Sequence, residues 1–202
     1  MPVFGYVSGL GEYDSAAQLQ KINNNPKKFQ IGMVFSLIAH LSVITLPILL
    51  FVVFSPYNII LGIVWMIFRI GEGSILIYND KNYWGLINKA KRYSVTNGAE
   101  QNSISDLALT ILKTRDKRWD FTQFLWGLGT LTFSIMLVTY GAVTPFIGWL
   151  GIGAGIFGVF YNGIKFVKIN LKKTILKVFI IIGSLFGILF EVLIGGLLLF
   201  FP

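Results

Sequence analysis

Long apolar blocks separated by short polar segments dominate the hydropathy pattern of this 202-residue chain. Each block has about 20 residues or more, which is the length that a helix needs to cross about 30 Å of hydrocarbon. The pattern therefore predicts an all-α fold, a polytopic transmembrane bundle over residues 31–202 that follows a polar N-terminal tail over residues 1–30. Its five predicted spans are residues 31–54, 58–78, 121–140, 144–167 and 177–201.

One long loop is predicted, residues 79–120 between the second and third spans. Within it, Ser103-Ile104-Ser105-Asp106 is typical of a helix start. Apolar residues then recur on one helix face, at Ile104, Leu107, Ala108, Ile111 and Leu112. We expect an amphipathic helix over about residues 104–115 that lies at the membrane interface and is anchored by Trp119. The alternative is a helix that packs on the loop's own Tyr83-Trp84 segment.

Composition supports a membrane protein. Hydrophobic residues make up 54% of the chain and charged residues 13%, which is about half the charged fraction of a soluble domain. The sequence has no cysteine, which excludes disulfides, thiolate metal sites and cysteine nucleophiles. The net charge of +8 has its common cause in cytoplasmic basic residues that face anionic lipid headgroups. We therefore expect the bilayer and its anionic headgroups as partners, and no nucleic acid.

The distribution of basic residues predicts the orientation. Of the 17 Lys and Arg residues, three lie in the N-terminal tail, eight in residues 79–120 and five in residues 165–177. Arg69 is the one that lies well inside a span, and the two short turns have none. The positive-inside rule then places the N-terminus in the cytoplasm and the C-terminus outside the cell membrane.

Four ionisable residues lie inside predicted spans: His40, Arg69, Glu72 and Glu191. Such residues are costly in hydrocarbon and are expected to face the bundle interior and pair. Arg69 and Glu72 are three residues apart, so they share one helix face. Counting from the cytoplasmic ends places His40 level with Arg69 and Glu191 about one turn further out. We expect the four to form one intramembrane polar layer.

Glycines recur at helical spacing in the last two predicted spans. Such stripes let two helices approach closely, so we expect these spans to pack as a pair. The same faces are candidates for contact with a protein partner or for homo-oligomerisation. The glycines are Gly148, Gly151, Gly155 and Gly158 in the fourth span, and Gly183, Gly187 and Gly195 in the fifth.

Three functions stay open for the polar layer. It can be a structural lock, a path for a substrate, an ion or a proton, or a site of catalysis on lipid. His40 with two carboxylates is a possible metal-ligand set, but no spacing motif supports it, so we assign no metal, cofactor or catalytic residue. The leading hypothesis is a non-enzymatic accessory, scaffold or regulatory subunit. The alternatives are a small transporter or proton-coupled carrier and, third, a membrane enzyme or binder that acts on lipid.

Two stretches of the chain carry a family resemblance. Phe68-Arg69-Ile70-Gly71-Glu72 is similar to an Arg-x-x-Glu core, and residues 126–151 contain a glycine-containing span, a short turn, Pro145 and a Gly-rich next span. Both resemble a prokaryotic multi-spanning integral-membrane family of unknown function, the domain of unknown function 4386, over about residues 20–165. The resemblance implies a helical membrane protein and no particular activity, with Arg69 and Glu72 as signature residues.

Overall fold

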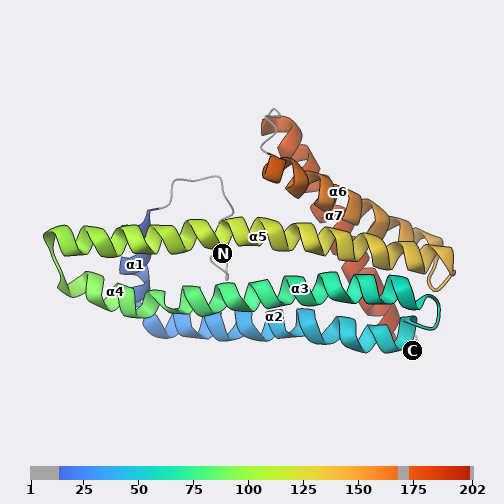
Figure 1. Ribbon diagram of the computed structural model, residues 1–202, viewed down its shortest axis with the longest axis horizontal. Helices are drawn as coiled ribbons and strands as arrows, with labels where there is room; N and C mark the ends of the chain where they lie inside the picture. Colours follow the sequence, from blue (N-terminus) through green and yellow to red (C-terminus); the bar gives the residue numbers. More distant parts are fainter. Residues whose placement is uncertain (1–13, 168–172, 201–202) are drawn as a thin grey trace. The chain divides into compact units, whose positions relative to one another are not determined.

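The computed structural model describes residues 14–167 and 173–200, and within these ranges the regular structure is α-helical throughout. This confirms the predicted all-α class. Figure 1 shows the helices in chain order: α1 (Ser15–Asn24), α2 (Pro26–Phe54), α3 (Ile59–Trp84), α4 (Leu86–Val95), α5 (Gly98–Thr139), α6 (Pro145–Val167) and α7 (Lys173–Phe200).

Five helical stretches of the described residues are long and apolar enough to cross a membrane. They are Pro26–Phe54, Ile59–Val95, Gly98–Thr139, Pro145–Val167 and Thr174–Phe200. The number confirms the predicted five spans. Several stretches are longer than predicted, because polar residues extend the helices beyond the apolar blocks from which the spans were located.

The chain divides into two compact units by the contacts within it. Unit 1 consists of the described parts of residues 1–42 and 74–119, and unit 2 of the described parts of residues 43–73 and 120–202. Helices α2, α3 and α5 contribute residues to both units. Hydropathy could not predict this division, because it reports the environment of each helix and not which side chains meet.

Unit 1 has its own apolar core, built largely from segments outside the predicted spans. Helix α1 starts at Asp14, whose side chain accepts a hydrogen bond of 2.8 Å from the Ala17 amide, and α1 packs on α4 (Figure 1). Burial of these apolar side chains stabilises the unit. The core residues are Leu19, Ile22, Met33, Tyr83, Leu86, Ile87, Ala90, Ile104, Ala108 and Leu112.

The predicted interfacial helix over residues 104–115 is replaced by the alternative packing. These residues belong to the continuous helix α5, and Ile104, Ala108 and Leu112 are buried in the same core as Tyr83. The predicted apolar face is therefore buried against protein at these three residues, whereas Leu107 of the same face is exposed. Residues 79–120 are accordingly helical for most of their length, through the end of α3, all of α4 and the start of α5.

Unit 2 contains an aromatic-rich core. The Trp65 ring stacks on Phe133 with 4.4 Å between centroids, and Phe54 meets the same Phe133 edge-on at 5.2 Å. Two short turns of unit 2, one between α2 and α3 and the other between α5 and α6, are joined by a 2.8 Å hydrogen bond from Asn58 Nδ2 to the Tyr140 hydroxyl. Gly141 in the second turn has a φ of 61°, a left-handed conformation that glycine adopts without strain.

The glycine stripe of α6 contacts α5 as well as α7, the helix with which the spacing predicted it to pair. A Cβ added at Gly155 would lie 2.8 Å from the backbone of Leu131, and one at Gly158 would lie 3.1 Å from Trp126. Along the same stripe, Gly148 faces Val138, and Gly151 faces both Ser134 of α5 and Phe190 of α7. Spacing identifies a close-packing face, but it does not show that two helices share it.

Helices α6 and α7 lie side by side, as the sequence predicted for these two spans (Figure 1). Gly183 of α7 packs against Phe157 of α6, and Gly187 packs against Trp126 of α5. Gly195 differs from both: no atom of the described residues lies within 4 Å of a Cβ built there. Of the three predicted packing glycines in the last span, two therefore meet a neighbouring helix.

Candidate functional site: paired charges in the membrane helices

Arg69 and Glu72 form an ion pair on α3. The Arg69 Nη1 atom donates to Glu72 Oε2 at 2.7 Å, and the two side chains are 15% and 5% exposed. Gly129 of α5 makes room for the arginine, because a Cβ there would lie 3.1 Å from Arg69 Cδ. The predicted one-face arrangement is therefore present, and a small residue on the neighbouring helix accommodates the aliphatic part of the arginine.

His40 has a partner that the sequence did not indicate. Its Nδ1 atom lies 2.7 Å from Asp80 Oδ2, and the Ser36 hydroxyl donates to Asp80 Oδ1 at 3.1 Å. All three residues are buried. One carboxylate of α3 thus bridges two positions of α2 that are one helical turn apart, and it fastens the two helices together.

Asp80 was missed because hydropathy ends the second span at Tyr78, which left Asp80 in the expected loop. The helical periodicity of the sequence nevertheless indicated that Asp80 is buried. Leu76, Asp80, Tyr83 and Ile87 are spaced at i, i+4, i+7 and i+11, and all four are buried. A polar residue in a continuing buried stripe indicates that the helix runs on and that the side chain has a partner.

Glu191 differs from the buried pairs because it lies on an exposed part of α7. Its Oε1 atom accepts a hydrogen bond of 3.0 Å from the indole Nε1 of Trp126 on α5. Glu191, Arg69 and Glu72 belong to unit 2, whereas His40 belongs to unit 1. The expectation that all four form one layer stays a prediction.

Cations and tyrosines pair in each unit, near the ends of the apolar stretches. In unit 1, the guanidinium of Arg115 lies 3.9 Å above the Tyr83 ring and that of Arg118 lies 4.7 Å above Tyr78. In unit 2, Lys165 Nζ lies 4.8 Å above the Tyr161 ring and also bonds Asp120 Oδ1 at 2.7 Å. Amphipathic aromatic rings and long basic side chains are typical of the headgroup level of a bilayer.

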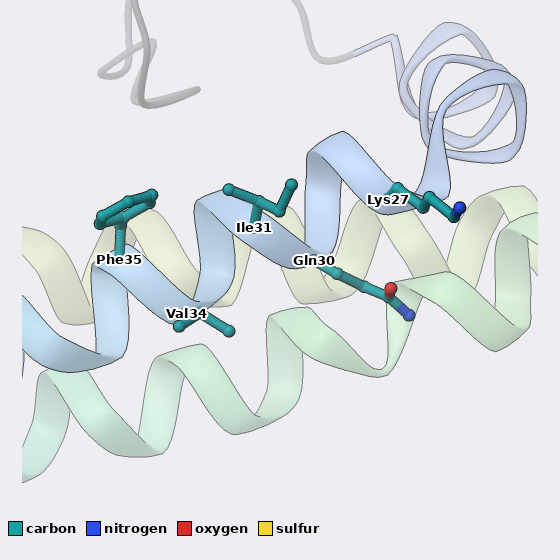
Figure 2. Close-up of a pocket in the computed structure, with 5 residues that line it drawn as sticks. All are labelled: Lys27, Gln30, Ile31, Val34 and Phe35. Carbon is teal, nitrogen blue, oxygen red and sulfur yellow. The ribbon is translucent and has the colours of Figure 1, made fainter.

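A shallow hollow lies on the surface of α2 in unit 1. Figure 2 shows its lining, which is polar at the end formed by Lys27 and Gln30 and apolar toward Phe35; the remaining two lining residues are Ile31 and Val34. None of His40, Arg69, Glu72 and Glu191 lines it. Among the described residues, no three His, Asp or Glu side chains are grouped so that they could hold a metal ion.

These features define the class of protein: a helical protein whose five long apolar helices are suited to a multi-pass arrangement in a membrane. The chain belongs to the family described as a domain of unknown function (DUF4386), which it matches over residues 2–201. The match confirms the predicted resemblance and extends it to almost the whole chain. Comparison with curated proteins and with solved structures gave no match.

Proposed function

We propose that this chain is a non-enzymatic accessory, scaffold or regulatory subunit of a prokaryotic cell membrane. The observation that carries the proposal is the pairing of its buried charges. Arg69 is bonded to Glu72, and His40 to Asp80, each at 2.7 Å and each with both side chains largely buried. Charges that are satisfied in place favour a structural role, because a transport path needs charged groups that water or a substrate can reach.

The position of the Arg69–Glu72 pair on a single helix adds to this argument. Both residues are on α3, so movement of α3 against its neighbours would leave their bond intact. A charge alone at the centre of a span costs about 2.5–3.5 kcal/mol on insertion scales. A pair within one turn removes most of that cost before the helix meets another, which suits a permanent structural element better than a gate.

The proposed orientation, with the N-terminus in the cytoplasm and the C-terminus outside, rests on the sixteen basic residues that lie at or beyond the same ends of the predicted spans. Two contacts are compatible with it. Helix α1 packs on α4, and two spans separate the two helices in the chain. The order of spans therefore assigns both helices to the same side of the membrane. The Asn58–Tyr140 hydrogen bond joins the two short turns, which the same order of spans assigns to the other side.

Topology can be tested with a reporter enzyme that is active only outside the cytoplasm. Fusion after Pro202 should give an active reporter, whereas fusion at Asn97, between α4 and α5, should give an inactive one. The opposite result at both positions would invert the orientation. Activity at neither position would contradict the odd number of crossings.

The subunit role predicts a stable protein partner. After extraction in a mild detergent, quantitative mass spectrometry should find one membrane protein at a fixed ratio to this chain. The carrier alternative is tested with the purified protein in liposomes. Proton or solute uptake that His40→Gln or Asp80→Asn abolishes would overturn the proposal, as would turnover of added phospholipid by the purified protein.

A further inference from the structure

Glu191 is a carboxylate on the outer surface of a membrane-type helix. It lies nine residues before Phe200 at the end of α7, which is about 13 Å along the helix and therefore well inside the hydrocarbon. The adjacent side chains on that face, Ile188 and Val192, are exposed. Glu191 thus stands at the edge of a surface that lipid or another protein must cover.

Among the residues that the structure describes, Glu191 accepts a hydrogen bond from Trp126 and forms no ion pair with a Lys, Arg or His side chain. Trp126 Nε1 donates one neutral hydrogen bond at 3.0 Å, whereas an ionised carboxylate offers about four acceptor positions. Glu72, by comparison, has a guanidinium group at 2.7 Å. A carboxylate at this depth is costly unless a cation or further donors reach it, and lipid tails supply neither.

Gly195, one helical turn after Glu191, leaves a notch beside the carboxylate. No atom of the described residues lies within 4 Å of a Cβ built at Gly195, while the glycines of α6 from Gly148 to Gly158 are filled by neighbouring side chains or backbone. Together the positions follow one helix face at i, i+3, i+4, i+7 and i+11: Ile188, Glu191, Val192, Gly195 and Leu199. A small residue on an uncovered face lets a second helix approach closely.

We propose that this α7 face docks a transmembrane helix of a partner protein, and that this helix carries a Lys, Arg or His side chain at the depth of Glu191. The proposal rests on the accessory function above and specifies its contact surface. Charge complementarity selects a cationic partner over a second copy of this chain. A second copy would bring another Glu191 to the same face, and the Arg and His deep in its spans, Arg69 and His40, are already bonded to Glu72 and Asp80.

The test uses the full-length protein in liposomes with synthetic transmembrane peptides, and it measures association by energy transfer. One peptide is a Leu/Ala-rich helix with a single central Lys, and the control peptide has Leu at that position. The wild-type protein should bind the Lys peptide about tenfold more tightly, the scale of one interhelical polar contact. Glu191→Gln, which keeps the size and the acceptor for Trp126, should remove the preference.

Two glycine variants provide the matched control. Gly195→Leu fills the notch and should weaken binding of the Lys peptide by about the same factor of ten as the loss of charge. Gly196→Leu also enters open space, since no atom of the described residues lies within 4 Å of its Cβ, but it points about 100° away from Gly195, toward the edge of the face one turn after Val192, and should weaken binding clearly less than Gly195→Leu. Equal effects of the two variants would overturn the proposed face.

The outcomes separate this proposal from the accessory function itself. No preference for the Lys peptide, or a preference that survives Glu191→Gln, overturns the docking face. Self-association that depends on Glu191 without any Lys preference assigns the face to a second copy. If a cell-derived partner still co-purifies with Glu191→Gln at the wild-type ratio, this surface is wrong and the subunit role stands; if none co-purifies with any variant, the subunit role itself fails.

Discussion

Arg69 and Glu72 compensate each other's charge in the hydrocarbon within one turn of one helix. Their bond is short and both side chains are largely buried. A buried ion pair of this kind is weak evidence for added stability, because desolvation offsets most of the attraction. The pair matters because a protein with only one of the two charges buried would be less stable than a protein with both.

This reasoning predicts an order of stability. Arg69→Ala leaves the Glu72 carboxylate buried without its cation and should cost about 3–5 kcal/mol, whereas Arg69→Ala with Glu72→Ala should cost less than the single change. Melting temperatures in detergent compare the variants, with Glu72→Ala as the reciprocal single change. A double variant that melts at or below the temperature of Arg69→Ala would contradict an energetic role for the pair.

The sequence predicted the Arg69–Glu72 contact because helix geometry alone brings i and i+3 together. It could not predict the bond between His40 and Asp80, because that contact depends on how α2 and α3 are aligned. Span boundaries drawn from hydropathy are also blind to a polar residue that is buried by pairing. Contacts within a helix can therefore be read from spacing, while contacts between helices need the fold.

At the scale of elements, α5 is the helix on which unit 2 is organised. Its Gly127 and Gly129 accept α6 and Arg69 respectively, and the α6 glycines accept its side chains in return. In a membrane, where the hydrophobic effect does not drive helices together, such close contact supplies much of the attraction. Glycine position is therefore a direct determinant of stability in this unit.

Two alanine substitutions should consequently have different effects. Gly155→Ala places a Cβ 2.8 Å from the Leu131 backbone, which cannot rotate away, and should destabilise by about 1–3 kcal/mol. Gly195→Ala enters open space on an exposed helix face and should be neutral or stabilising by up to about 1 kcal/mol. Thermal unfolding in detergent measures both. Equal losses at the two positions would contradict the observed packing.

For the molecule as a whole, the two units have separate apolar cores. The core of unit 1 gathers side chains from α1, α4 and the first turns of α5, together with Met33 and Tyr83. The core of unit 2 lies among the spans. The number of spans was predictable because each is a property of local composition; the second core was not, because its members are scattered over residues 19–112.

Hydrogen exchange can test the core of unit 1. Amides of residues 86–95 and 98–112 should be protected in the wild-type protein, as expected for packed helices and not for a loop. Ala108→Asp buries a charge at a position that is 1% exposed and should abolish protection across the unit. Leu107→Asp, at a position that is 52% exposed, is the control and should leave protection unchanged. Loss of protection in the control would indicate an interfacial helix instead.

The location of α1 has a consequence for biosynthesis. Leu19 and Ile22 find their apolar partners around Tyr83 and beyond, in chain that is made roughly 60 residues later. At about 5–20 residues per second, α1 waits about 3–12 s after its own synthesis before those partners exist. During that time α2 and α3 must both enter the membrane, so correct insertion of this helical hairpin is a precondition for closing the core of unit 1. A nascent chain that fails to insert would present α1 to chaperones and proteases.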